Sequence, residues 1–485
     1  MGQNALIVLN HLLHCCVEGD ILRKRFTCIC GALACAVLSP LASQDNSLSG
    51  SLSAQTGYGL PNTHDNKGHV LTGLTAFNTV FKSYQDESMV YVDASILYDG
   101  IGSLSSNGTE SMVSDDGRLA LKLKEAYFDY NGSWWSLRAG RQIVAWGKAD
   151  GIQIADILCP QDSSVLLATD YKETRLGIDA LRLSLNGNAA SLDAYWIPFF
   201  TPSTLPLAGG NPLHAVLFPS SASVDSETIA ISAPESMSDL ETPEKKLSNS
   251  EYALRLTAYL SALDLSLYGF YGWDDLPFIS YTGEFAEDEE SGDYYLSGLS
   301  LSGTYKRVLM GAFDAAIPAG DLVLRFEGAF FPNRYMQTNA AYQLAAQLAG
   351  EKDYYAKKQH QAVGLAGFDW EAGNGWTITA QYVADGIFAD KDEIEKLDRR
   401  RFEQQVTLSI EKLLLNETLT LSASGALDLR DYSSATELSA EYSLSDAIKL
   451  SVIGNLFLEG PDDKEGMYGA YHDLSAVTVK GKICF

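Results

Sequence analysis

The most constraining feature of this sequence is a repeated segment of about ten residues in which apolar and polar side chains alternate. In the run 254–260, leucine or alanine alternates with Arg255, Thr257 and Tyr259. The runs 376–382 and 437–442 repeat the pattern, and aromatic residues lie near several segment ends. Such alternation gives a strand one apolar face. Strands of this length with aromatic ends are typical of β-strands that cross a membrane.

We predict about eighteen such strands, and sixteen is the alternative count. The expected strands lie near 47–58, 68–84, 87–99, 117–130, 133–145, 171–185, 189–199, 250–261, 263–272, 294–315, 321–331, 360–371, 375–384, 402–413, 417–427, 431–443, 446–457 and 467–485.

The connections between these segments alternate between tight turns and long stretches. Asn131-Gly132 and Gly373-Asn374 are tight, whereas 100–116 and 200–249 are long, and 428–430 is a short exception. Outer-membrane barrels have short turns at one end, longer loops at the other and an even strand number, whereas a β-sandwich has no reason for this order. The sequence therefore predicts an all-β fold, a transmembrane antiparallel up-and-down β-barrel.

Composition agrees with this fold. Hydrophobic residues make up 46% of the chain and charged residues 20%, which excludes a disordered chain. The mean hydropathy of -0.05 fits the average of an apolar outer surface and a polar lumen. With a net charge of -27, nucleic acid is not expected as a partner.

The N-terminal region predicts export. Basic residues at 23–25 precede an apolar run at 26–42, which is typical of a signal peptide. We expect residues 1–43 to be a signal peptide with an upstream extension and 44–485 to be the barrel, located in the cell outer membrane. The alternatives are a transmembrane helix, a translation start at Leu22 and a lipoprotein site at 32–35. Only Cys159 and Cys484 follow residue 43, so no disulfide scaffold is expected.

The hairpin 117–145 carries the candidate pore residues. Asn131-Gly132 favours a two-residue type I′ turn, which would place Glu125 opposite Arg138. Bulges near Lys124 and Gly140 would turn neighbouring basic side chains into the lumen. The expected lumenal cluster is Lys122, Lys124, Glu125, Arg138 and Arg141, and further pore-lining candidates are Trp146, Asp150, Asp156, Arg255 and Arg325. These charges either set ion preference or form structural ion pairs in a plugged lumen.

Two long loops contain more apolar residues than an external loop needs. Residues 146–162 include Ile152, Ile154, Ile157 and Leu158, and the second loop is apolar from 205 to 218. We expect the loops 146–170 and 200–249 to fold inward against the wall.

The C-terminal strand is amphipathic and ends in an aromatic residue. Val477, Val479, Ile483 and Phe485 share one face, and Lys480 and Lys482 lie on the other. Such an ending resembles the signal that outer-membrane proteins present to the barrel-assembly machinery, with Phe485 and Ile483 as its residues. An ordinary edge strand is the alternative.

A short pattern resembles a known family of large barrels. It comprises Glu125-Ala126-Tyr127, the run 137–142, Trp146-Gly147, Asp156, and Pro160 followed by Asp162. This pattern is similar to that of a poorly characterised porin-like family of Gram-negative outer membranes and, more distantly, of alginate-export barrels. The resemblance implies a large monomeric channel with Arg138 and Arg141 at the pore wall. Cys159 is a departure from the pattern.

Sequence motifs of catalysis are missing after residue 43: there is no zinc-protease, phosphate-loop or nucleophile-elbow motif. We expect no enzyme activity, no cofactor and no metal site. The acidic run 284–293 lacks regular ligand spacing and is expected to be a solvated loop tip.

The leading functional hypothesis is a porin-like channel for passive diffusion of small polar or charged solutes. Its expected partners are outer-membrane lipid, the barrel-assembly machinery and those solutes. The alternatives are a surface adhesin or structural barrel with a blocked lumen, and a secreted β-sandwich or unrecognised enzyme. Basic wall residues favour anions and acidic loops favour cations, so the ion preference stays open.

Overall fold

The computed structural model describes residues 45–61, 66–109, 111–165, 171–218, 221–224, 227–232, 234, 239–287, 294–461 and 466–485. The predicted signal peptide lies outside the described residues. No helix in the described part of the chain is both long and apolar enough to cross a membrane.

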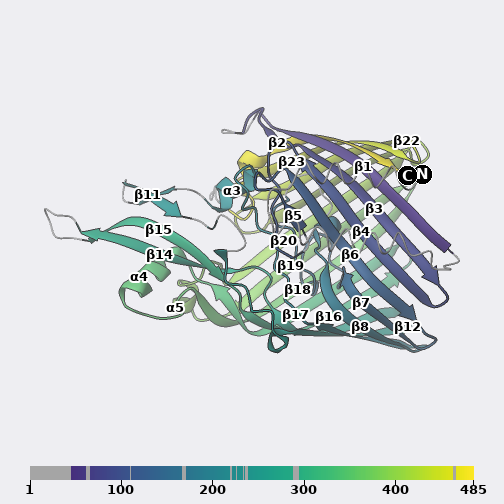
Figure 1. Ribbon diagram of the computed structural model, residues 1–485, viewed down its shortest axis with the longest axis horizontal. Coiled ribbons are helices and arrows are strands. Elements are labelled where there is room, and N and C mark those ends of the chain that lie inside the picture. Colours follow the sequence, from purple (N-terminus) through teal and green to yellow (C-terminus); the bar gives the residue numbers. More distant parts are fainter. Residues whose placement is uncertain are drawn as a thin grey trace, which may run out of the picture.

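Eighteen antiparallel strands form a closed barrel (Figure 1). They are β1 (Asp45–Gly59), β3 (Leu74–Gln85), β4 (Ser88–Asp99), β6 (Leu119–Asn131), β7 (Trp135–Gln142), β8 (Ile178–Asn186), β9 (Ala190–Ile197), β12 (Glu251–Leu260), β13 (Leu263–Trp273), β16 (Arg307–Ala319), β17 (Leu322–Gln337), β18 (Ala356–Gly373), β19 (Trp376–Phe388), β20 (Phe402–Leu414), β21 (Leu419–Asp428), β22 (Ser434–Ser445), β23 (Ile448–Leu458) and β24 (Ala476–Cys484). Each pairs with its neighbour along the chain, and β24 pairs with β1 to close the ring. The predicted fold class and strand number are confirmed.

The remaining elements lie at the loop end. Short strands β2 (Val70–Thr72) and β5 (Ser111–Val113) extend the wall. A separate four-stranded sheet contains β10 (Ser221–Val224), β11 (Glu227–Ser232), β14 (Phe278–Glu287) and β15 (Tyr294–Thr304). The helices are η1 (Tyr171–Thr174), α3 (Pro212–Leu217), η3 (Leu247–Asn249), α4 (Ala340–Leu348), α5 (Lys391–Ile394) and η4 (Gly469–Leu474).

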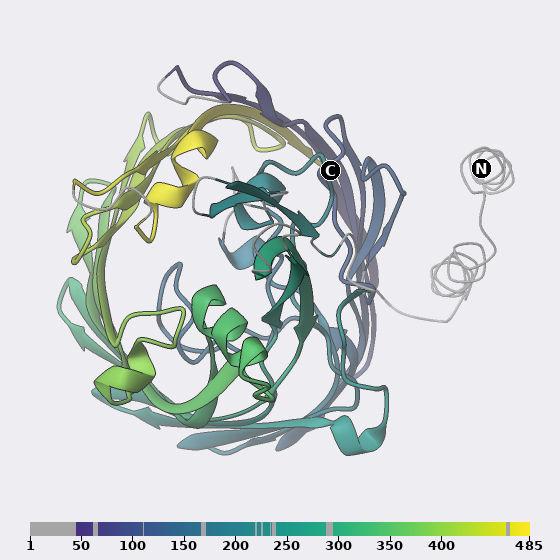
Figure 2. The same ribbon diagram turned by 90° about the vertical axis from the view of Figure 1, so that its left-hand side faces the viewer.

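Short and long connections are segregated between the two ends of the barrel. The turns after β3, β8 and β18 are tight and lie at the end where β24 finishes, whereas the long connections lie at the opposite end (Figure 1). Seen from that loop end, the wall is a ring, and α4 and the β14–β15 hairpin lie within its outline (Figure 2). Apart from the short connection between β21 and β22, loop length in the sequence therefore indicates the end of the barrel that a connection occupies.

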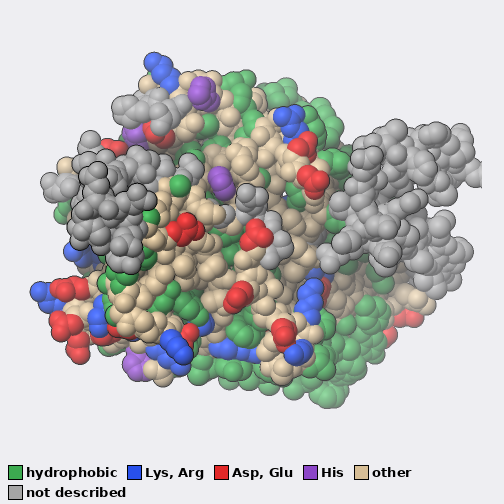
Figure 3. All heavy atoms as spheres, turned by 60° about the vertical axis from the view of Figure 1, so that its left-hand side comes forward, with side chains coloured by type: hydrophobic (Ala, Val, Ile, Leu, Met, Phe, Trp, Pro, Cys, Tyr) green, Lys and Arg blue, Asp and Glu red, His purple; other side chains and the backbone are tan. Residues whose placement is uncertain are grey.

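The alternation of side chains separates a lipid-facing surface from the lumen. Phe128, Trp370 and Val479 are exposed on the outer surface, whereas their strand neighbours Asp129 and Thr478 are buried inside. Hydrophobic side chains cover the visible barrel wall, and charged side chains gather over the loop end (Figure 3). An apolar band of this kind is what a barrel needs in order to span a bilayer.

The structure corrects two details of the strand prediction. The expected strand 294–315 is two strands, because β15 leaves the wall and pairs with β14 and β11, while β16 begins at Arg307. The β6–β7 hairpin pairs Asp129 with Arg138, so Glu125 is not opposite Arg138 as expected. The connection includes residues 132–134 and is longer than a two-residue turn, which shifts the register.

Candidate functional site

After β7 the chain turns into the lumen and crosses it; we call residues 143–162 the crossing loop. Its first amide, Ile143 N–H, donates to Glu125 Oε1 over 2.7 Å. Val144 N–H then donates to Cys159 Sγ over 3.1 Å, which joins the two ends of the loop. The loop therefore starts from the wall next to β6 and returns to it.

The crossing loop stays inside because its apolar side chains bury against the wall. Ile154, Ala155 and Leu158 are each at most 4% exposed. They pack with inward-facing residues of the strands from β8 to β19, and this group is called the lumenal core. Its wall residues are Ile178, Ala180, Tyr195, Ile197, Ala253, Tyr268, Phe270, Val308, Met310, Ala329, Phe331, Leu365 and Val383. The hydrophobic effect thus holds the loop on one side of the barrel.

A buried carboxylate from the wall fixes the middle of the crossing loop. Glu327 on β17 accepts hydrogen bonds from the amides of Lys148 (2.6 Å), Ala149 (2.9 Å) and Ala155 (2.8 Å). Gly147 has φ +76° and lies so close that a Cβ there would overlap the Glu327 carboxylate. Three charge-assisted bonds to one acceptor fix the loop backbone against β17.

Side chains of the loop add further attachments. Asp150 forms an ion pair of 2.7 Å with Arg325, and its amide donates to Gln381 Oε1 over 2.9 Å. Asp156 accepts from the Trp146 amide over 2.9 Å and pairs with Arg175. Burial raises the pKa of the Asp156 carboxyl, although the Trp146 amide and the Arg175 guanidinium oppose that rise.

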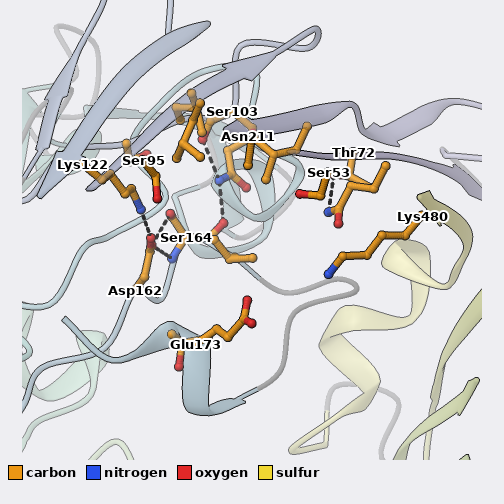
Figure 4. A pocket seen from close by; sticks show the side chains of 18 of the residues that line it. Ser53, Thr72, Ser95, Ser103, Lys122, Asp162, Ser164, Glu173, Asn211 and Lys480 are labelled. Atoms are coloured by element: carbon orange, nitrogen blue, oxygen red, sulfur yellow. Dashed lines mark hydrogen bonds and ion pairs between the residues drawn. The ribbon is translucent and has the colours of Figure 1, made fainter. Parts of the chain in front are cut away.

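On the other side of the crossing loop lies a cavity of about 370 Å³ that is lined by both polar and apolar side chains. Its wall comes from β1, β3, β4, β6 and β24, and Asp162 at the end of the crossing loop also lines it. Because four lysines line it, namely Lys122, Lys124, Lys480 and Lys482, we call it the lysine cavity. Figure 4 shows Lys480 extending into this space opposite Lys122 and Asp162, with the Glu173 carboxylate directed into it from η1.

The model of a family described as a protein of unknown function (DUF1302) matches residues 32–450. The chain belongs to this family. No curated protein matches it.

Several solved barrels are similar in architecture. The outer-membrane channel DcaP of Acinetobacter baumannii is 11% identical, with a TM-score of 0.42 and 92% of this chain and 98% of that chain covered. Pseudomonas aeruginosa OccK8 (OprE) is 10% identical, with a TM-score of 0.47 and coverage of 91% and 98%. OccK1 (OpdK) of the same organism is also 10% identical, with a TM-score of 0.46 and the same coverage.

Three of the expected pore residues lie close together on β6 of this DUF1302 barrel, namely Lys122, Lys124 and Glu125. Lys122 pairs with Asp162 at 2.5 Å, and Lys124 is the extra residue of a bulge, because Asp93 pairs with Glu125 and Ala94 with Leu123. The predicted bulge near Lys124 is confirmed. The β7 register continues through Gly140, so a bulge there is not found, although its φ is +125°.

The two arginines of the expected cluster have other surroundings. Arg138 pairs with Asp129 at 2.9 Å and its guanidinium lies 4.1 Å from the Tyr127 ring centroid. Arg141 pairs with Asp179 at 2.9 Å and also donates to the Thr109 carbonyl. Neither arginine is among the residues that line the lysine cavity.

The other candidates divide between buried and accessible positions. Trp146 and Asp156 are each only 4% exposed, so they support the crossing loop and do not line open space. Arg255 pairs with Asp193 at 2.7 Å, and Arg325 holds Asp150 and Asp369. Among the described residues, no group of histidines, cysteines or carboxylates could hold a metal ion.

The second long loop also packs into the loop end of the barrel. Its amide at Thr204 donates to the Gln161 carbonyl over 3.0 Å, and Asn211 donates to the carbonyls of Ser103 and Ser164. Leu213 of α3 is buried beside Leu71 and Leu474. Residues 200–218 therefore tie the crossing loop to the opposite wall.

Sequence reasoning missed Glu327 and Gln381, which hold the crossing loop. The available signal was a polar side chain at an inward position of an amphipathic strand, but many residues share it. Lys480 and Lys482 carried a clearer signal, because they lie on the inward face of the last strand. Their grouping with Lys124 depends on closure between β24 and β1, which no local pattern specifies.

Proposed function

We propose that this DUF1302 protein is an outer-membrane channel that lets small polar solutes diffuse across the membrane. The observation that carries the proposal is the unequal filling of a closed barrel. The crossing loop and the lumenal core occupy one side, and the lysine cavity leaves open space on the other. Inward loops that narrow a lumen without filling it are how porin-like barrels restrict passage.

The proposed orientation follows from loop length. Short turns face the periplasm in outer-membrane barrels, so the loop end with α4 and the β14–β15 hairpin would face outward. Ile483 and Phe485 lie exposed on the lipid-facing side of the last strand, as the proposed recognition by the barrel-assembly machinery requires.

The test is single-channel recording of the refolded protein in planar bilayers. Stepwise conductance is the expected result, and a variant without 146–162 should give larger steps, because it lacks the loop that narrows the lumen. No steps from either, nor from a variant that also lacks 200–249, would contradict the proposal. That outcome would instead favour a blocked barrel whose loops bind partners.

A further inference from the structure

We infer that the lysine cavity binds small oxyanions, such as carboxylates and inorganic phosphate, and gives the channel a preference for anions. The inference rests on the proposed function, because it treats the cavity as part of the solute route. It adds the class of solute, which the barrel architecture alone leaves open.

Several basic groups of the inner wall already have a carboxylate partner. Arg138 pairs with Asp129 at 2.9 Å, Arg255 with Asp193 at 2.7 Å, and Arg325 with Asp150 at 2.7 Å. Ion pairs of this kind offset the charge within the wall, and they agree with a structural role for these arginines. A solute would have to displace an internal partner in order to use them.

Three lysines of the cavity differ from these arginines. Lys124, Lys480 and Lys482 are half-buried, and none forms an ion pair with a carboxylate in the part of the chain that the structure describes. Lys124 comes from β6 and the other two come from β24, with β1, β3 and β4 between them in the wall. Barrel closure thus gathers three ammonium groups around one space without a matching set of carboxylates.

The carboxylates of the cavity do not cancel this charge. They are Asp93, Asp162 and Glu173. Asp162 is held by Lys122 at 2.5 Å, and Asp93 accepts from Asn78 over 2.6 Å. The cavity therefore has four lysines against three carboxylates, whereas the whole chain has 35 basic and 62 acidic side chains. Basic side chains therefore outnumber acidic ones in the cavity, although acidic side chains outnumber basic ones in the whole chain.

Neutral donors complete the lining for an oxyanion. Hydroxyl groups of Ser51, Ser53 and Ser95 and the amide of Gln55 face the same space as the lysines. Ammonium, hydroxyl and amide groups all donate hydrogen bonds to carboxylate or phosphate oxygens. A cavity of about 370 Å³ is at the small end of ligand sites, which points to small solutes.

The test compares two triple variants that remove the same charge. K124Q/K480Q/K482Q changes the cavity, and K245Q/K246Q/K352Q changes exposed lysines of the loops. Heat-modifiable migration in detergent gels verifies that each variant folds. Reversal potentials in a potassium chloride gradient measure ion preference, and calorimetric titration with inorganic phosphate at constant ionic strength measures binding in detergent.

We expect the wild type and the loop variant to prefer chloride over potassium and to bind phosphate. The cavity variant should lose phosphate binding, and its anion-to-cation permeability ratio should fall about fivefold, which is the upper end of what one solvated charge pair contributes. Conductance without anion preference, or equal behaviour of the two variants, would overturn the inference and leave the channel proposal standing.

Absence of conductance would contradict the proposed function, and phosphate titration would then decide the inference alone. Binding that is lost only in the cavity variant would establish the oxyanion site in a non-conducting barrel. No binding by the wild type would reject it.

Discussion

At the scale of single residues, Gly147 is the position where the crossing loop tolerates least change. Gly147 and Gly151 have φ values of +76° and +73°, so alanine strains the backbone at both. Only at Gly147 would the added Cβ overlap the Glu327 carboxylate, since the site at Gly151 is open. We expect G147A to give larger and noisier conductance and a loss of about 1–3 kcal/mol in the free energy of unfolding beyond that of G151A. Single-channel recording and urea denaturation measure the two effects. Equal results for both variants would contradict the proposed role of Glu327.

The two cysteines that the structure describes should differ in reactivity. Cys159 is fully buried at the end of the crossing loop, and burial raises the pKa of its thiol to about 12. Cys484 is exposed. Because Cys484 is accessible and Cys159 is buried with a raised pKa, iodoacetamide at pH about 9 should label Cys484 in the folded protein and leave Cys159 unmodified. Mass spectrometry before and after heating in detergent measures the labelling, with C484S as the control. Labelling of folded C484S would show that the crossing loop opens.

At the scale of elements, α4 covers β14, which is an edge strand of the separate four-stranded sheet. Gln343 and Gln347 accept from the amides of Tyr281 and Gly283 on β14, over 2.9 and 3.0 Å. Uncovered strand edges pair with other chains, so these side chains protect β14. We expect Q343A/Q347A to aggregate faster and to be cleaved sooner by proteinase K within 278–287, with L348A on an exposed residue of the same helix as the control. Unchanged cleavage sites and rates, measured by mass spectrometry, would contradict this role.

Most of the barrel wall could be predicted from the sequence, whereas one strand and one hairpin register could not. Wall strands followed from alternation and loop length, because a closed barrel imposes both on each strand in turn. The prediction of one wall strand at 294–315 was wrong for β15, which belongs to the separate four-stranded sheet. Side chains of that strand alternate as they do in a wall strand, so the pattern did not distinguish the two. The predicted register of the β6–β7 hairpin was wrong at Arg138, because Asn131-Gly132 does not form the expected two-residue turn. Contacts such as Glu327 with the crossing loop join residues far apart in sequence, so no local pattern contained them.

At the scale of the whole molecule, the lumen has a side that is packed and a side that contains the lysine cavity. The packed side contains the lumenal core, where Ala329 is 5% exposed, and Ser53 on the other side lines the lysine cavity and is half-buried. Both residues lie on inward faces of wall strands, so position on the inner wall does not by itself decide contact with the solute route. A residue of the inner wall is shielded from the solute route where it packs against the crossing loop.

This division predicts different access to the two sides from water. In a background of C159S/C484S, a charged thiosulfonate reagent should reach S53C and lower its single-channel current, because the added sulfonate occupies the cavity and offsets its lysines. The same reagent should leave A329C unchanged, because the crossing loop excludes water from that position. Current before and after reagent measures both, and the background without a new cysteine is the control. A fall in current at A329C, or none at S53C, would place the solute route through the lumenal core and contradict the division of the lumen.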